Sequence, residues 1–205
     1  NNDFYIFGWR QVPVNPKVLG QKANDTRPEI EQIIFACEKK YDFQELERKL
    51  FVIRKKIENQ AAKEQLNDFY ISSLSSKSVI YKGMFLAENI ADFYPDLMDE
   101  RFTSRFAIFH QRFSTNTFPS WELAQPFRVL AHNGEINTLK GNVNWMKTHE
   151  AGMESDLFEN IDDIKPIIKA NNSDTASLDA AFELLVRGGR GLPIAKMMLI
   201  PEAWS

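Results

Sequence analysis

Cysteine and histidine are scarce in this sequence, and long apolar runs are missing from it. Its 205 residues include one cysteine, Cys37, and three histidines. A single cysteine excludes an internal disulfide and a cysteine-based zinc site. No apolar stretch approaches the roughly 20 residues that a helix needs to span a membrane. These absences favour a reducing intracellular compartment, and we expect a cytoplasmic protein that has no membrane partner.

The sequence also lacks a large excess of charge of either sign. The formal net charge is −3 and the pI is about 5.7, so the sequence offers no electrostatic footprint for nucleic acid. With 43% hydrophobic and 26% charged residues, the composition is typical of a globular protein, and the length fits one domain over residues 1–205. The first residue is not methionine and the last residues form no polar tail. We therefore expect a domain that is incomplete at its N-terminus and cut from a longer chain.

Hydrophobic periodicity and turn residues predict an α+β fold. Runs rich in aromatic and β-branched residues indicate strands, whereas apolar residues that recur every three or four positions indicate helices. The expected strands are 4–12, 69–74, 79–84, 105–110 and 127–132, the expected helices are 42–66, 86–93, 137–150 and 173–187, and 29–37 fits either a buried strand or a short helix. Segments 69–74 and 79–84 are typical of a hairpin, which implies antiparallel sheets faced by helices.

The first polar cluster, residues 110–117, directly follows an expected strand. Within it, Arg112 could donate two parallel charge-assisted hydrogen bonds to a carboxylate, with a nearby threonine hydroxyl as a further donor. An arginine in this position also fits an ordinary surface ion pair, which contributes little. The pattern by itself leaves both interpretations open.

The second polar cluster, residues 131–137, ends the next expected strand and contains Asn133 and Gly134. Asn-Gly is the commonest dipeptide of hairpin turns, so a plain turn is one interpretation. The functional interpretation is an oxyanion hole, in which the asparagine amide and the glycine backbone N–H both donate to a developing negative oxygen. Glycine would also let the backbone approach a substrate closely.

The third polar cluster, residues 171–179, opens an expected helix. Either Ser173 or Asp174 is placed to cap that helix. Alternatively, Asp174 is a buried carboxylate that pairs with a substrate ammonium group. An arginine for a carboxylate, an acid for an ammonium group and an Asn-Gly oxyanion hole together describe a pocket for an α-amino acid with an acyl side chain. Glutamine fits that description.

The three histidines, His110, His132 and His149, raise two other hypotheses. One is a Ser-His-Asp triad, but the sequence has no Gly-x-Ser-x-Gly elbow. The other is a zinc site, but the His-Glu-x-x-His spacing is missing. We therefore expect no metal site.

As a set, the polar clusters resemble the class II glutamine amidotransferase domain of glutamate synthase. The resemblance rests on His-Gln-Arg-Phe-Ser-Thr-Asn-Thr at 110–117, Leu-Ala-His-Asn-Gly-Glu-Ile-Asn-Thr at 130–138 and Ser-Asp-Thr-Ala-Ser-Leu-Asp at 173–179. Further similar stretches at 8–14, 47–50, 118–121, 140–142 and 198–204 extend it over nearly the whole chain. The Phe-Pro-Ser-Trp and Ile-Pro-Glu-Ala-Trp segments argue against the sugar-phosphate and purine branches of class II.

The resemblance implies a fold and a set of roles. The fold is that of the N-terminal-nucleophile hydrolases, a four-layer α-β-β-α sandwich of two antiparallel sheets. By motif, Arg112 binds the glutamine carboxylate with Thr115 assisting, and Asp174 holds the glutamine ammonium group. Asn133 and Gly134 form the oxyanion hole.

The same resemblance implies a nucleophile that the sequence does not contain. In this family an N-terminal cysteine, with its free α-amine as the base, attacks the glutamine amide and releases ammonia, and water then hydrolyses the thioester. Position 1 is Asn1, and Cys37 is internal, so we expect Cys37 to be a packed, inert thiol. The chain by itself should lack glutaminase turnover. A non-catalytic binding or scaffold domain is the remaining alternative.

Cofactors and partners follow from the family as well. The released ammonia passes to a synthase domain of the same polypeptide, where 2-oxoglutarate accepts it. FMN and an iron-sulfur cluster are expected in the full-length enzyme and no cofactor in this domain, and a reductase subunit or ferredoxin supplies electrons. The expected location is the cytoplasm, or the plastid of a photosynthetic eukaryote.

Overall fold

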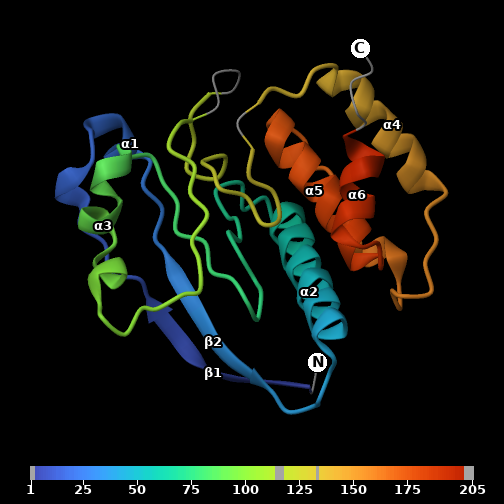
Figure 1. Cartoon of the computed structure of the whole chain (residues 1–205), viewed down its shortest axis with the longest axis horizontal. Helices are drawn as coiled ribbons and strands as arrows, with labels where there is room; N and C mark the ends of the chain where they lie inside the picture. Colours follow the sequence, from blue (N-terminus) through green and yellow to red (C-terminus); the bar gives the residue numbers. More distant parts are fainter. Residues whose placement is uncertain (1–2, 114–117, 133, 201–205) are drawn as a thin grey trace. The chain divides into compact units, whose positions relative to one another are not determined.

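The computed structural model describes residues 3–113, 118–132 and 134–200. The chain divides into two compact units, each built from two stretches of sequence (Figure 1). The first unit comprises Asn1–Asp42 and Tyr81–Pro126, and the second comprises Phe43–Ile80 and Phe127–Ser205.

The first unit contains a two-stranded antiparallel sheet. Strand β1 (Phe4–Gln11) pairs with β2 (Glu31–Cys37), and the register shifts between Ile6 and Gly8, which is the mark of a bulge. Sequence periodicity left 29–37 open between strand and helix, and the structure decides for a strand. Its β-branched and aromatic residues pair along the whole length of β1.

Short helical turns and an aromatic core complete this unit. The helical segments are η1 (Pro16–Val18), α1 (Gln21–Asp25), η2 (Ala87–Asn89), α3 (Ile90–Phe93) and η3 (Pro95–Met98). The predicted helix 86–93 is thus confirmed as η2 followed by α3, and Pro95 stops it as expected. Phe93 and Trp121 are buried with their ring centroids 5.6 Å apart, and the Trp121 indole N–H donates to the Ala23 carbonyl at 3.0 Å.

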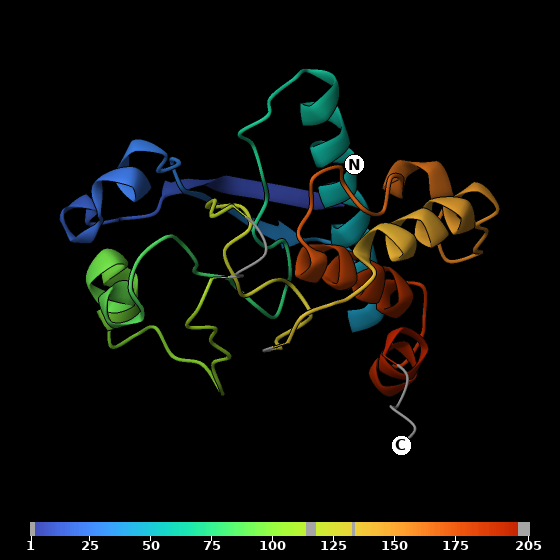
Figure 2. The same ribbon diagram turned by 90° about the horizontal axis from the view of Figure 1, so that it is seen from above.

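The second unit is helical. It contains α2 (Phe43–Lys63), α4 (Leu139–Ala151), η4 (Ile161–Ile164), α5 (Asp174–Arg187) and α6 (Leu192–Leu199). Helix α5 contacts α2, α4 and α6, as Figures 1 and 2 also show. The core that these helices enclose consists of Phe51, Phe158, Ile164, Ile167 and Leu184. The predicted helices 42–66, 137–150 and 173–187 are therefore confirmed.

The most buried face of α2 is unusual because it is largely charged. Leu50 and Phe51 are buried as the helical period predicts, but so are Glu47, Arg54, Lys55 and Glu58. Ile57, an apolar residue of the same helix, is 42% exposed. The helix was predicted from its period, and the structure shows that its buried face is largely charged.

Four expected strands are not strands in this structure. Segments 69–74, 79–84, 105–110 and 127–132 have an irregular backbone. A strand needs a partner that completes its hydrogen-bond ladder, and β-propensity describes only how side chains fit a sheet. In the part of the chain that the structure describes, the strands are β1 and β2 alone. The observed class is therefore helices with a small antiparallel sheet.

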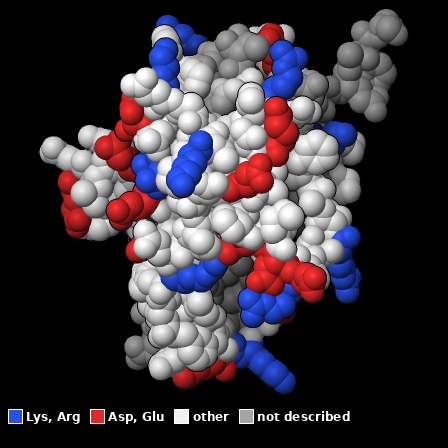
Figure 3. Space-filling model, turned by 90° about the vertical axis from the view of Figure 1, so that its left-hand side faces the viewer, with Lys and Arg blue, Asp and Glu red and all other residues white. Residues whose placement is uncertain are grey.

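The face of the molecule shown in Figure 3 agrees with the balanced composition. On the face shown in Figure 3, lysine and arginine side chains are interspersed with acids, and neither sign covers a continuous area. Among the described residues, no helix combines the length and the apolar character that crossing a bilayer requires.

Candidate functional site

Two of the predicted site residues belong to the first polar cluster. Arg112 lies in the first unit, in an irregular segment, and its side chain is exposed. It does not follow a strand end, because 105–110 is not a strand. Thr115 lies outside the described residues. Gly134 and Asp174 belong to the second unit, so their convergence with Arg112 stays a prediction.

The start of α5 explains which residue caps the helix. Ser173 has an extended backbone, and its hydroxyl accepts a hydrogen bond from the Ala176 N–H at 3.1 Å, as an N-cap does. Asp174 is consequently the first helical residue and not the cap. Its carboxylate accepts from the Thr175 N–H at 2.7 Å, close to the positive end of the helix dipole. The capping role is therefore filled without Asp174.

The structure brings the second and third polar clusters together. The backbone N–H of Ile136 donates to the Asp174 carboxylate at 3.1 Å. Asp174 is 7% exposed. The segment after Gly134 is thus attached to the acid that the sequence assigned to the substrate ammonium group. Asn133, the other member of the predicted oxyanion hole, lies outside the described residues.

His132 forms a second link between these clusters. Its Nε2 lies 3.1 Å from the Thr175 hydroxyl, and its Nδ1 accepts from the Gly134 N–H at 3.2 Å. Because Nδ1 is an acceptor, a neutral ring carries its proton on Nε2 and donates it to Thr175. The Gly134 N–H assigned to the oxyanion hole is therefore already bonded to an imidazole nitrogen.

A third link comes from Asp179, which the sequence analysis did not single out. Asp179 is 1% exposed, and its carboxylate accepts from three consecutive backbone N–H groups, those of Arg128 at 3.2 Å, Val129 at 2.9 Å and Leu130 at 3.0 Å. Burial raises the pKa of Asp179 and outweighs the Val129 hydrogen bond, which lowers it. A signal was present in the sequence, since Asp179 and Glu183 follow Thr175 at four-residue steps along one face of the helix.

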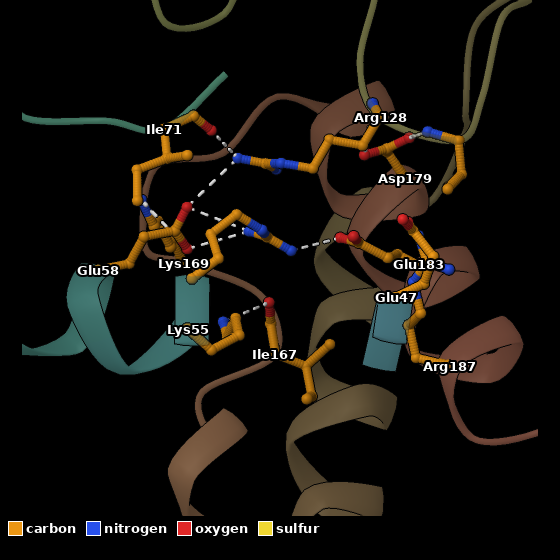
Figure 4. A network of polar contacts seen from close by, with 12 residues as sticks. Glu47, Lys55, Glu58, Ile71, Arg128, Ile167, Lys169, Asp179, Glu183 and Arg187 are labelled. Carbon is orange, nitrogen blue, oxygen red and sulfur yellow. Dashed lines mark hydrogen bonds and ion pairs between the residues drawn. The ribbon is translucent and has the colours of Figure 1, made fainter. Parts of the chain in front are cut away.

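Around these residues lies a network of buried charges, shown in Figure 4. The Arg54 guanidinium donates to Glu58 at 3.1 and 3.2 Å and to Glu183 at 2.5 Å. The Arg128 guanidinium contacts Glu58 at 3.2 Å and also donates to the Ile71 carbonyl. Burial opposes ionisation of Glu58, but the nearby cations outweigh it and hold the pKa of Glu58 below its ordinary value. This network joins α2, α5 and the segment that begins at Arg128.

Lys55 belongs to the same buried region. Its ammonium donates to the Pro166 carbonyl at 2.5 Å, and the Ile167 carbonyl lies at 3.5 Å. Burial lowers the pKa of Lys55 to about 8, although Glu58 opposes that shift. Lys55 is thus held by neutral acceptors, which compensate less for lost hydration than a carboxylate would.

The side chains that commonly bind metal ions form no metal centre among the residues described. No group of three or more histidine, cysteine, aspartate or glutamate side chains converges in that part of the structure. Cys37 ends β2 and is half-buried, with its thiol 3.3 Å from the Lys39 carbonyl. It is therefore less enclosed than the packed thiol that we expected.

Comparison with known proteins places the chain in a family. The model of the class II glutamine amidotransferases matches residues 1–205. This chain belongs to the class II glutamine amidotransferases. The predicted resemblance is thereby confirmed over the whole chain.

The curated relatives of this amidotransferase are considerably longer proteins. This chain is 61% identical to a "Glutamate synthase [NADPH] large chain" of Azospirillum brasilense and 50% identical to that of Bacillus subtilis. Each comparison covers 98% of this chain. It is 46% identical over 98% to the "Ferredoxin-dependent glutamate synthase 2, chloroplastic" of Arabidopsis thaliana. The chain spans 12–13% of the length of these relatives.

Proposed function

We propose that the chain is the glutaminase region of a longer glutamate synthase. It hydrolyses L-glutamine to glutamate and ammonia, and a synthase domain of the same polypeptide transfers the ammonia to 2-oxoglutarate. The observation that carries this proposal is the 61% identity to a glutamate synthase large chain over 98% of the residues. The attachment of the Gly134 segment to Asp174 supports it, because both are needed for one glutamine pocket.

Asp174 is the proposed partner of the glutamine ammonium group. Its carboxylate accepts from Ile136 and from Thr175 in this structure, which leaves free acceptor capacity, since a carboxylate offers about four lone-pair sites. The low exposure of Asp174 makes a pairing with a cation strong, because little water screens it. Arg112, with Thr115 assisting, is the proposed ligand of the glutamine carboxylate.

Asn133 and Gly134 are the proposed oxyanion hole. The negative oxygen that develops when the amide carbonyl is attacked would take the Gly134 N–H from His132 Nδ1. This exchange costs little, because one hydrogen-bond acceptor replaces another and the imidazole stays attached to Thr175 through Nε2. The incoming oxyanion is also the stronger acceptor, being charged.

The nucleophile is proposed to be a cysteine of the full-length protein outside these residues. Cys37 has no free α-amine, since its backbone nitrogen is part of β2. An iron-sulfur cluster does not fit this chain, because such clusters are held by several thiolates and the chain has one cysteine. FMN and the cluster accordingly belong to other parts of the enzyme, as do contacts to a reductase subunit or ferredoxin.

For the complete domain we propose the four-layer sandwich of the N-terminal-nucleophile hydrolases. The irregular segments at 69–74, 79–84, 105–110 and 127–132 have strand-type sequences, and partner strands elsewhere in the full-length protein would complete their ladders. The proposed location is the cytoplasm, or the plastid in a photosynthetic eukaryote.

The substitution Asp174→Asn in the full-length protein tests this proposal. Asparagine keeps the size of the side chain but removes the charge that pairs with the ammonium group. A charge-assisted hydrogen bond contributes roughly 1.5–3 kcal/mol, so we expect kcat/KM for glutamine to fall on the order of tenfold to a hundredfold. The measurement is ammonia release from glutamine, together with the thermal midpoint.

The matched control is Asp162→Asn, at a residue of η4 whose side chain is 75% exposed. It should leave glutamine hydrolysis unchanged. The isolated chain should release no ammonia above a heat-inactivated sample, because its nucleophile is missing. Absence of glutaminase activity from the full-length protein would refute the proposed function, and unchanged kinetics of Asp174→Asn would refute the role of Asp174 alone.

A further inference from the structure

The segment that carries the proposed oxyanion hole is attached to α5 at both of its ends. At the beginning, three consecutive N–H groups, from Arg128 to Leu130, donate to the Asp179 carboxylate at 2.9–3.2 Å. At the end, the Ile136 N–H donates to Asp174 at 3.1 Å. Between these points the His132 ring contacts Thr175. One helix thus fixes a segment whose described residues, 128–132 and 134–136, have no regular secondary structure.

The three attachment points lie close together on α5. Thr175 and Asp179 are four residues apart, so their side chains project from the same face of the helix. Both are buried, at 2% and 1% exposure. Buried side chains on a helix have few accessible rotamers, so this face is a more rigid support than a loop would be.

We propose that Asp179 is a positioning residue for the oxyanion hole, which it aligns by holding the backbone from Arg128 to Leu130 against α5. This inference rests on the proposed glutaminase function. Asp179 is not assigned any contact with the substrate. Its role follows from the geometry that oxyanion stabilisation demands, since donors help only when they are held at hydrogen-bond distance from the place where the charge develops.

A carboxylate suits this role better than any other side chain of its size. Asp179 Oδ1 accepts from Val129 and Leu130, while Oδ2 accepts from Arg128. An asparagine in its place has only one acceptor oxygen, and its NH2 group would face a third N–H donor. An unpaired donor in such a buried position is costly, so the backbone is expected to shift until that donor finds another partner.

The test is Asp179→Asn in the full-length protein, with kcat and KM for glutamine measured separately. Loss of one oxyanion-hole donor lowers kcat by about a hundredfold to a thousandfold, so a misaligned donor should lower it by roughly tenfold to a hundredfold. KM should change less than threefold, because the oxyanion forms only in the transition state. The dissociation constant for the product L-glutamate should likewise stay within threefold, since glutamate fills the pocket without forming an oxyanion.

The matched control is Glu47→Gln in the same unit. Glu47 is a buried acid of α2, 2% exposed, and it accepts from Ser75, Ser76 and Arg187. The substitution lowers the number of buried acceptors in a comparable way, but Ser75, Ser76 and Arg187 all lie outside the segment 128–136. We expect a similar loss of thermal stability and an unchanged kcat.

A second variant and a measurement without activity complete the design. Thr175→Val keeps the shape of the side chain but removes its hydroxyl and therefore the hydrogen bond to His132. Because only one contact with the segment is lost, kcat should fall by a smaller factor than in Asp179→Asn. Amide hydrogen exchange of Val129 and Leu130 should accelerate at least tenfold in Asp179→Asn and stay unchanged in Glu47→Gln.

The outcomes separate the inference from the proposed function. A lower kcat with an unchanged glutamate affinity and faster exchange of Val129 supports the positioning role. An unchanged kcat, or an equal loss of kcat in Glu47→Gln, overturns it, as does unaltered exchange. Absence of glutamine hydrolysis in the unsubstituted protein would instead refute the proposed glutaminase function.

Discussion

The two units each contain an arginine paired with carboxylates, but the surroundings of the pairs differ. In the first unit the Arg10 guanidinium donates to Asp96 at 2.5 and 2.8 Å, and the Arg10 side chain is 39% exposed. In the second unit Arg54 is 4% exposed between Glu58 and Glu183. Water can replace a lost partner at Arg10 but not at Arg54. The same chemical pair should therefore contribute very different amounts to stability.

Protonation behaves differently at the two places as well. At Asp96 the hydrogen bond from Arg10 comes first among the causes that hold the pKa of this carboxyl below its ordinary value. At Glu58 the largest influence is burial, which raises the pKa, and several cations together are needed to reverse it. A buried acid therefore depends on the whole network around it, whereas at Asp96 the hydrogen bonds from Arg10 and Tyr81 are enough to lower the pKa.

The largest expected effect is that of Glu183→Gln, which would leave Arg54 with one carboxylate partner in a buried place. Breaking a buried ion pair costs about 3–5 kcal/mol, and we expect a loss of unfolding free energy of that order. Urea unfolding of the chain measures this loss, and amide hydrogen exchange in α5 provides a second, separate measurement. A loss as small as that of an exposed pair would show that water reaches Arg54, and the comparison between the units would fail.

A second prediction concerns pH and sharpens the comparison further. The folded pKa of Lys55, about 8, lies below its ordinary value of 10.5. Between these values the unfolded chain binds a proton that the folded chain does not, so the unfolding free energy rises with pH there, by about 1.4 kcal/mol per unit at most. Below pH 8 both states are protonated and this contribution is constant.

The variant Lys55→Met isolates that dependence. Methionine fills a similar volume without an ionisable group, so the rise between pH 8 and 10.5 should be reduced relative to the parent. Urea unfolding at half-unit pH intervals provides the comparison, and Lys56→Met, at a side chain that is 56% exposed, serves as the control. Parallel pH profiles for the parent and Lys55→Met would contradict the prediction.

The smallest expected effect is that of Asp96→Asn in the first unit. Arg10 keeps its hydrogen bond to Gln32 at 2.8 Å and regains water, so the loss should be about 1 kcal/mol. Because the folded pKa of Asp96 is lowered, its contribution is present above the ordinary value and disappears as the pH falls through the folded pKa. The difference between parent and variant should therefore vanish in acid. A difference that persists there would indicate lost packing and not lost charge.

Sequence patterns predicted the long helices well because the evidence for them is local. Helix α5 begins where a serine can cap it, and α2 repeats its apolar residues at the helical period. The strands were predicted less reliably. Strand β1 found its partner in β2, but 105–110, with an equally strand-like composition, has no ladder in the described structure. A strand depends on a second segment, which a local pattern does not specify.

The sequence by itself determined the family and the identities of the candidate site residues, because motifs carry that information in the order of side chains. Tertiary structure alone decided that Ser173 caps α5 and that Asp174 receives the Ile136 N–H. It also decided that Asp179 is buried beneath three backbone donors. In sequence an aspartate on a helix suggests an exposed position. Only folding shows which backbone groups lack partners, and a buried N–H group that lacks one requires an acceptor such as this carboxylate.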